Sequence, residues 1–485
     1  MTVTPYRANL FHDRKELYQL LCTGKQHSIE KNCPQIVSIS QEIKQLDPLA
    51  VLQAIAKPNQ LQFYFEKRSQ NEAIAALDAV ISFKTEGSDR FQKSQEFIKS
   101  CLAKIIKNGD LNLPISGPHF FCSFTFFDDN LAIDSPFPSA TVFLPRWQVS
   151  CCKNRCVLVA NVEIKPQVNL DFLLEALCNK IKIINKLETR IANGNGRANT
   201  QTQFIRPGTN QSEKFKSSVS TALELIQSNH FSKIVLADAV DVVLPLPFNL
   251  VNYLNNLRKR YPDCYVFSIS NCKGQNFIGA SPERLLSIHN HQLMTDALAG
   301  SAPRGKTAAE DAEFADRLLS SEKERHEHRF VRDFIAERLS QLGLIPQLLP
   351  TPRLRQLSNI QHLWTPIQTQ LTADIHPLEI VAKLHPTPAV AGVPTTVAQE
   401  QIRRYETFDR SLYAAPLGWV DYQGNCEFIV GIRSALIESE KSSHVRPTSY
   451  RARLYAGAGI VAGSDPNKEL AEIQLKLQAL LKALL

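Results

Sequence analysis

The chain has 485 residues, of which 44% are hydrophobic and 21% charged, a balance that excludes a disordered or fibrous protein and leaves ample material for a large core. The formal net charge of +8 is compatible with three partners: nucleic acid, an anionic membrane surface or an anionic small molecule. Because the Lys and Arg residues are scattered, with no run of five like charges, we favour an anionic metabolite and expect no nucleic acid partner.

The sequence carries no sign of membrane insertion or export. It contains no stretch of 18 apolar residues, and its first 16 residues include Asp13 and Glu16 instead of an apolar signal-peptide core. The eleven cysteines form no CxxC pair, and Cys151, Cys152 and Cys156 have no His/Cys group at zinc-finger spacing. We therefore expect a cytoplasmic protein with reduced thiols and without zinc.

The first 190 residues mix helical and strand patterns. Strands are indicated by segments rich in aromatic and β-branched residues, namely Leu61–Lys67, Phe120–Phe127, Thr141–Val149 and Val157–Ile164. A polar stretch over residues 190–210, rich in Asn, Gly and Thr, is the best linker candidate in the chain.

Beyond this linker the periodicity becomes clearer. Apolar residues at helical spacing predict helices around Phe215–Ile226 and Leu250–Leu257, a helix or pair of helices over Glu310–Leu342, and a last helix that opens at Asp465–Pro466. Strands are predicted for Lys233–Leu244 and Cys264–Ser270, and a strand, tight loop and second strand for Phe277–Ile288. Because strands and helices follow no strict alternation and no GxGxxG follows a strand, we expect a layered α+β fold rather than a doubly wound one.

One charged string, SEKERHEH at residues 321–328, is a candidate metal site. Glu327 lies one turn before Val331 and so extends an apolar helix face, where a carboxylate needs a partner or a metal. His326 and His328 are two residues apart, which is wrong for a helical zinc pair. A hard cation held by oxygen fits better. Spacing alone, however, favours a solvated charged turn.

The last helix leaves a similar choice open. Its core face carries leucines and an isoleucine, while Glu469, Glu472 and Lys476 share a second face. Two acids three residues apart could present oxygens to Mg²⁺. Spacing alone favours an exposed ion pair between Glu472 and Lys476.

Two further residues are candidates for proton transfer. Lys233 opens an otherwise apolar strand, where a lysine usually reaches water, but in a closed, cation-lined cleft it can act as a base. Glu283 follows the Gly-Ala-Ser-Pro turn of FIGASPERLL, residues 277–286. A turn carboxylate is normally a surface group, yet acid–base chemistry requires such a second titratable group.

Three small-residue strings complete the set of motifs. ALAGSAPRG (297–305) and YAGAGIV (455–461) would let backbone N–H groups approach an anion closely. HPTPAVAGVP (385–394) is a conformationally restricted loop with three prolines.

Taken together, the motifs resemble those of the chorismate-utilising enzymes over roughly residues 205–482. The strings KIVLAD, GASPERLL, LAGSAPRG, SEKERHEH, HPTPAVAG, GIRSA and YAGAGIV occur in that family's order. The family includes isochorismate synthases, salicylate synthases and the large subunits of anthranilate and aminodeoxychorismate synthase. Residues 61–82 and 120–149 also resemble the divergent N-terminal part of menaquinone-type isochorismate synthases.

The resemblance implies a fold and a division of the chain. We expect large antiparallel and mixed β-sheets packed as a sandwich, with helices on the outside. Residues 1–200 would form the divergent N-terminal part and residues 201–485 the chorismate-binding catalytic region, within one structural domain overall. The family also implies a monomer that binds the small molecule chorismate and no membrane.

It also implies roles for individual residues. Lys233 matches the general base that activates water, and Glu283 the general acid that protonates the departing hydroxyl. The Mg²⁺ ligands correspond to Glu327 and Glu472. Two further sets match by position: the acids beside the metal, Glu324 and Glu469, and the groups around the substrate, Gly300, Ser301, His362, Ala389, Tyr413, Arg433, Gly457 and Lys476.

The implied activity is that of an isochorismate synthase, which adds water at C2 of chorismate and removes the C4 hydroxyl in a reversible, Mg²⁺-dependent reaction. Amine-transferring relatives carry glutamine in place of Lys233. Salicylate synthases share the lysine but usually carry threonine in place of Ala389, and they remain the alternative. The remaining rivals are a scaffold without catalysis and a zinc hydrolase built on His326 and His328. The N-terminal resemblance favours quinone biosynthesis, that of menaquinone or phylloquinone.

Overall fold

The computed structural model describes residues 13–129, 135–187, 209–244, 248–358, 360–371, 375–440 and 449–484. The N-terminal part contains the helices α1 (Arg14–Glu30), α2 (Pro48–Ile55), α3 (Arg90–Leu102) and α4 (Leu170–Asn185). Its strands are β1 (Gln35–Ile43), β2 (Gln62–Lys67), β3 (Glu72–Thr85), β4 (Ile105–Gly109), β5 (His119–Phe124), β6 (Ala140–Cys152) and β7 (Arg155–Ile164).

The C-terminal part contains the helices α5 (Thr209–Gln227), α6 (Leu250–Arg260), α7 (Ala308–Ser320), α8 (Glu322–Gln341), α9 (Pro377–Leu384), α10 (Thr395–Tyr405) and α11 (Pro466–Leu484). Its first strands are β8 (Lys233–Leu244), β9 (Tyr265–Ser270), β10 (Asn276–Ser281), β11 (Arg284–His289), β12 (Gln292–Pro303) and β13 (Gln347–Leu348). The later ones are β14 (Arg353–Gln356), β15 (Ile360–Gln370), β16 (Gly392–Val393), β17 (Pro416–Asp421), β18 (Cys426–Val430), β19 (Ser434–Glu440) and β20 (Ser449–Val461).

The strands form two long arms that branch from β6. One arm runs β6–β3–β2–β9–β10–β19–β20–β8–β16, and the other runs β6–β5–β17–β18–β11–β12–β15. The pairs β2–β9 and β5–β17 join strands of the N-terminal part to strands of the C-terminal part. Among the described strands, every pair is antiparallel except β1 with β4.

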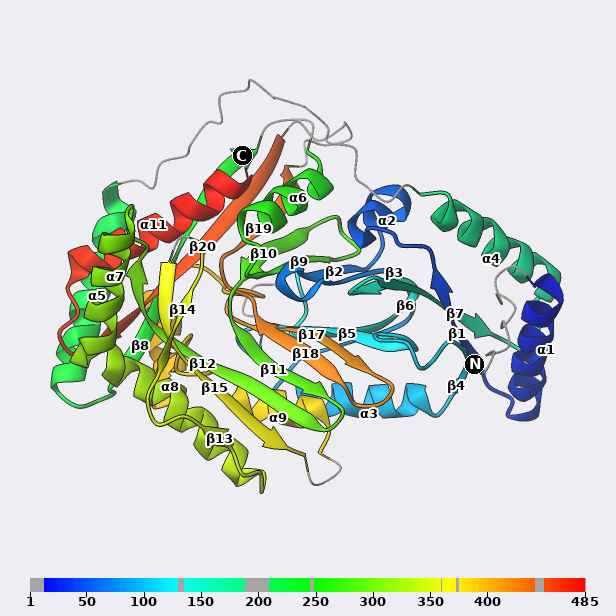
Figure 1. Cartoon of the computed structure of the whole chain (residues 1–485), viewed down its shortest axis with the longest axis horizontal. Coiled ribbons are helices and arrows are strands. Elements are labelled where there is room, and N and C mark those ends of the chain that lie inside the picture. The colour runs from blue at the N-terminus through cyan, green and yellow to red at the C-terminus, as the bar shows by residue number, and fades with distance from the viewer. Residues whose placement is uncertain are drawn as a thin grey trace.

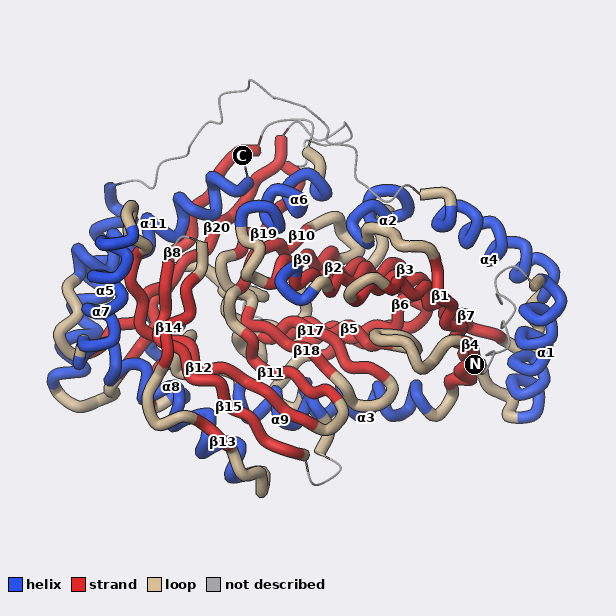
Figure 2. The backbone as a smooth tube through the Cα atoms, in the orientation of Figure 1, coloured by secondary structure: helices blue, strands red, loops and turns tan. Residues whose placement is uncertain are grey.

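The two arms face each other as a sandwich with helices outside. The ring of Phe63 on β2 lies 5.0 Å from that of Phe121 on β5, across the space between the arms. The neighbouring Phe120 points to the other face and contacts Phe97 of α3, because successive side chains of a strand alternate between faces. Figure 2 shows the strands filling the middle of the molecule and the helices lying around its rim. The expected α+β sandwich is therefore confirmed.

The predicted elements agree with the structure in kind and differ at some ends. The segment Phe120–Phe127 leaves its sheet after Phe124, because the backbone N–H of Phe126 bonds to the carbonyl of Ser411 instead. Glu310–Leu342 is a pair of helices that part at Ser321, whose side chain caps α8 by accepting from the N–H of Glu324. The predicted linker lies outside the described residues up to residue 208, and α5 follows at once. The division at residue 200 stays a prediction.

The cysteines correct one expectation. Cys151 and Cys156 lie directly opposite each other in the β6–β7 pair, with Cα atoms 4.1 Å apart, and they form a disulfide. The expectation of reduced thiols is wrong for this pair, since the hairpin register that aligns them is not visible in their spacing. Over the ranges described above, no helix is long and apolar enough to cross a membrane.

Candidate active site

The candidate residues gather around one cavity beside β8, β12, β15 and β20. Figure 1 shows these four strands in the same half of the molecule. It encloses about 1000 Å³, its open mouth included. Helices α5 and α11 cover β8 and β20, and α8 covers β12 and β15. Every candidate residue lines the cavity except Lys233, which lies directly behind it against Glu327. Residues up to 243 positions apart in the chain, Lys233 and Lys476, are thus brought to one site.

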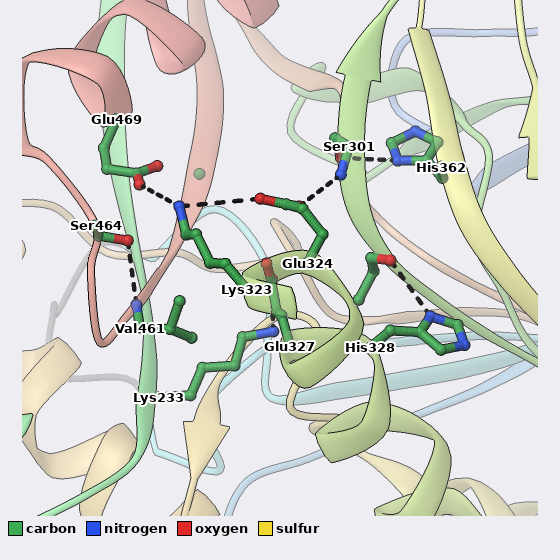
Figure 3. Close-up of polar contacts among 12 residues, drawn as sticks. Lys233, Ser301, Lys323, Glu324, Glu327, His328, His362, Val461, Ser464 and Glu469 are labelled. Atoms are coloured by element: carbon green, nitrogen blue, oxygen red, sulfur yellow. Dashed lines mark hydrogen bonds and ion pairs between the residues drawn. The ribbon is translucent and has the colours of Figure 1, made fainter. Parts of the chain in front are cut away.

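Lys233 is fully buried, contrary to the usual habit of a lysine at a strand start. It pairs with Val461 of β20 on one side and Val393 of β16 on the other, so β8 lies between two strands already at its first residue. Its Nζ lies 2.9 Å from Oε1 of Glu327 (Figure 3). Nζ makes no well-aligned hydrogen bond to the described residues, and the ion pair is therefore the contact that orients it.

Gly459 makes this ion pair sterically feasible. A Cβ at this position would lie 2.5 Å from Oε1 of Glu327 and 3.4 Å from Cε of Lys233. Only the absence of a side chain lets the carboxylate approach the strand so closely. Gly459 was not among the residues predicted from the sequence. It lies within YAGAGIV, a string that was chosen because its small residues let other groups approach the backbone closely.

Glu283 is buried at the tight connection between β10 and β11. The Oγ of Ser281 accepts from the backbone N–H of Glu283 at 3.2 Å and so fixes the turn. Burial raises the pKa of Glu283 to about 8, and Asp296 adds to the rise, while Lys233 and Arg433 oppose it. The carboxyl therefore carries its proton at neutral pH, which is the state a general acid requires.

Four carboxylates face the same end of the cavity. Glu324 and Glu327 come from α8, and Glu469 and Glu472 from α11. Burial raises the pKa of Glu324 to about 7, with Glu327 as the second cause. The side chain of Glu327 is only 14% exposed, and the predicted solvated turn is wrong for this residue.

Lysines act as counter-ions to these acids. Lys323 Nζ lies 3.3 Å from Glu469 Oε1 and 3.9 Å from Glu324 Oε1, as Figure 3 shows. Lys476 Nζ lies 2.7 Å from Glu472 Oε1. The exposed-pair prediction for Glu472 and Lys476 is thus half right: the pair forms, but both side chains line the cavity. The bridging role of Lys323 was missed, although SEKERHEH contains it.

The acids fit Mg²⁺ by chemistry. Carboxylate oxygens are the donors that this cation prefers, and gathering like charges at one site is costly unless a cation offsets them. Among the described residues, no three His, Cys, Asp or Glu side chains lie close enough together to hold a metal ion as they stand. Glu327 and Glu472, with Glu324 and Glu469 beside them, are the residues that would hold the ion.

The two histidines of SEKERHEH do not form a zinc pair. His328 is buried, with Nε2 2.8 Å from the Oγ1 of Thr365 and Nδ1 3.3 Å from the carbonyl of Ala299. Burial lowers its pKa to about 4. His326 is exposed and packs on Phe330. The rings thus lie in different surroundings, as their spacing predicts.

A relay of three polar side chains forms the wall beside β15. Arg433 Nη2 donates to Nε2 of His362 at 3.0 Å, so the ring proton must lie on Nδ1. Nδ1 then donates to Oγ of Ser301 at 2.8 Å, and the serine hydroxyl keeps its own proton to donate. Burial and the charge of Arg433 hold the pKa of His362 well below its usual value. The other nitrogen, Arg433 Nη1, is buried without a partner among the described residues.

The remaining candidates line the cavity with glycine backbone and with the side chains packed against it. Gly300 has φ +80° at the bulge of β12, and a Cβ there would lie 3.2 Å from Glu324 Oε2. Lys476 Nζ donates to the carbonyl of Gly457 at 2.8 Å. A Cβ on Gly457 would lie 2.7 Å from the hydroxyl of Tyr413. Ala389 lines another wall.

This fold and this collection of side chains belong to a known class. The model of the chorismate binding enzyme family matches residues 23–485. The chain belongs to this family, and the resemblance seen in the motifs is confirmed.

Within this family, the chain is similar to several proteins named as isochorismate synthases. The chain is 31% identical over 462 residues to the salicylate biosynthesis isochorismate synthase of Pseudomonas aeruginosa, covering 93% of this chain and 90% of that protein. It is 29% identical to isochorismate synthase MenF of Bacillus subtilis, covering 97% of each. The solved structure of MenF, the menaquinone-specific isochorismate synthase of Escherichia coli, superposes with a TM-score of 0.74 at 25% identity, covering 96% of this chain and 100% of that one.

Proposed function

We propose that this chain is an isochorismate synthase that converts chorismate into isochorismate with the help of Mg²⁺. The proposal is supported above all by two buried groups at this site, the proton-bearing Glu283, which lines the cavity, and Lys233, which lies behind it against Glu327. The names of the similar proteins from Pseudomonas, Bacillus and Escherichia support the same activity.

The substrate carries two carboxylates, and the cavity offers cationic and polar donors for them. Arg433 Nη1 has no partner among the described residues and is the strongest candidate for one carboxylate. Lys476, Tyr413 and the backbone at Gly457 lie together and would hold a carboxylate as well. The hydroxyl of Ser301 remains free to donate a further hydrogen bond to the ring end.

Glu327 and Glu472 would hold the Mg²⁺, with Glu324 and Glu469 beside it. Bound there, the ion would supply positive charge that orients the ring carboxylate and polarises the conjugated system. The protein contributes the positions of α8 and α11, each of which carries two of these four acids.

Proton transfer would be shared between the lysine and the glutamate. The lysine must first be neutral. Lys233 then takes a proton from water as the water oxygen bonds to C2 and the ring double bond shifts. Glu283 gives its proton to the C4 hydroxyl, which leaves as water. In the reverse direction the protonated Lys233 would act as the acid and the ionised Glu283 as the base, so the reaction would be reversible.

The rival activity is that of a salicylate synthase, which would go on to release pyruvate. Ala389, where salicylate synthases usually carry threonine, favours release of intact isochorismate. The test is to incubate the purified protein with chorismate and Mg²⁺ and to resolve the products over time. Isochorismate approaching a mixture with chorismate supports the proposal. Salicylate with pyruvate would transfer the activity to the lyase, and tight chorismate binding without turnover would support a scaffold.

The cellular setting is also a proposal. The Escherichia coli neighbour is described as menaquinone-specific, and we propose a role in quinone biosynthesis, that of menaquinone or phylloquinone. We also propose a monomeric protein that acts in the cytoplasm. Light scattering across a concentration series would return a constant mass of about one chain if the monomer is correct.

A further inference from the structure

A fully buried arginine lies behind the cavity without lining it. Arg410 binds both carboxylate oxygens of Glu406, with Nε 2.8 Å from Oε2 and Nη2 2.5 Å from Oε1. Neither side chain reaches solvent to any extent, at 0% and 3% exposed. The guanidinium also lies over the ring of Phe126, 4.3 Å from its centre.

The remaining bonds of this pair reach several walls of the cavity. Arg410 Nη1 donates to the carbonyl of Val390, and Nη2 to the carbonyl of Val235, both at 2.8 Å. Val390 adjoins Ala389, and Val235 lies on β8 two residues after Lys233; both valines line the cavity. The carbonyl of Arg410 itself accepts from the N–H of Tyr413 at 2.7 Å.

Glu406 completes the connection to β8. Its Oε1 accepts from the backbone N–H of Ala237 at 2.8 Å. One ion pair therefore ties together β8, the loop that carries Ala389 and the turn that carries Tyr413. A buried ion pair is weak evidence for stability, since apolar packing often serves as well. A planar guanidinium, however, fixes the geometry of its acceptors in a way that a flexible lysine does not.

We propose that Arg410 is a positioning residue that sets the spacing between the Lys233 strand and the Ala389–Val390 wall, and that this spacing keeps the enzyme from eliminating pyruvate. The inference rests on the proposed function. In the elimination that this spacing suppresses, the hydrogen on C2 of isochorismate passes to the methylene carbon of the enolpyruvyl group. The bond between ring carbon C3 and the enolpyruvyl oxygen breaks at the same time. The products are salicylate and pyruvate, with no other reactant.

The test compares Arg410→Lys with a matched control in the full-length protein with Mg²⁺ and chorismate. The control is Arg258→Lys, which alters another largely buried bidentate pair, with Asp47 at 2.7 Å and 3.0 Å, away from the cavity. We expect Arg410→Lys to lower kcat by about tenfold to a hundredfold, because displacement of positioning groups by about 1 Å costs that much. Its fraction of product released as pyruvate should rise above that of the wild type, while Arg258→Lys stays within about twofold on each measure.

Glu406→Asp guards against a folding failure of the first variant. It keeps the charge pair but draws the carboxylate back by one methylene, so the guanidinium must leave its two carbonyls or its acid. Circular dichroism and thermal melts establish the folded fraction, and rates are expressed per folded molecule. We expect the same rise in pyruvate as in Arg410→Lys.

The outcomes separate this inference from the proposed function. If both variants keep wild-type kcat, KM and pyruvate fraction, or if their losses match those of Arg258→Lys, the inference is overturned. If the wild type itself forms no isochorismate, the proposed function fails and takes this inference with it. Normal wild-type turnover together with pyruvate release in both variants supports it.

Discussion

Lys233 combines burial with a single oriented ion pair, and its chemistry follows from that combination. We expect Lys233→Ala to bind chorismate with little change but to lose turnover by roughly 10²–10⁴-fold, the usual contribution of a general base. Equilibrium binding and single-turnover kinetics measure the two effects separately. Lys233→Arg is the matched variant, since it keeps the charge beside Glu327 but cannot give up its proton. Turnover that survives in the arginine variant would remove Lys233 from the base role.

The raised pKa of Glu283 leads us to expect a defined pH dependence of kcat/KM. Its pKa is raised to about 8, chiefly by burial, so the protonated acid dominates below that pH and is lost as the pH rises through it. The pH profile of kcat/KM should therefore fall on its alkaline side near pH 8. Glu283→Gln, which keeps the shape but cannot deliver a proton, should be nearly inactive at every pH. A wild-type profile that still rises above about pH 9 would contradict the assignment.

At the scale of single elements, α8 and α11 are the supports of the proposed metal site. Both helices were predicted from apolar periodicity, and the start of α11 at Asp465 was predicted as well. The break at Ser321 was not predicted, since the sequence left one helix or two open over Glu310–Leu342. The direction in which their acids point was not, because periodicity identifies a face but not its neighbour. Spacing alone favoured solvent for Glu327 and Glu472, and only contact with β8 and β20 places them at the cavity.

The proposed role of Glu472 as a Mg²⁺ ligand can be tested without measuring catalysis. We expect Glu472→Gln to weaken Mg²⁺ binding by about tenfold or more in a calorimetric titration, since one charged oxygen donor is lost. Glu337→Gln is the control, because this glutamate lies on the exposed side of α8. Equal Mg²⁺ affinity in the wild type and in Glu472→Gln would exclude Glu472 as a ligand.

At the scale of the whole molecule, the two arms of the sheet decide where the site forms. β8 and β20 are paired although more than 200 residues separate Lys233 from Val461. No local pattern predicts such a pairing. The family resemblance predicted the sandwich and the residues of the site, but not which strands pair. The same limit explains the disulfide, since Cys151 meets Cys156 only through the register of β6 and β7.

Residues that shape the site through backbone contacts were the least predictable. Gly459 is required by a carboxylate from another helix, and Arg410 by two carbonyls from different strands and loops. The contacts that require these residues form only when the two arms of the sheet have come together. In contrast, strands such as Lys233–Leu244 were predictable to the residue, because their apolar character reflects their own burial.

Turnover in ¹⁸O-water shows whether water adds at C2 while the C4 hydroxyl departs. The protein is supplied with unlabelled chorismate and Mg²⁺, and the first isochorismate formed is analysed by mass spectrometry with fragmentation. We expect one ¹⁸O atom per isochorismate, located in the C2 hydroxyl, and no label in reactions with Lys233→Ala. Isochorismate without ¹⁸O at early times would mean that the original hydroxyl migrates, and would contradict the roles given to Lys233 and Glu283.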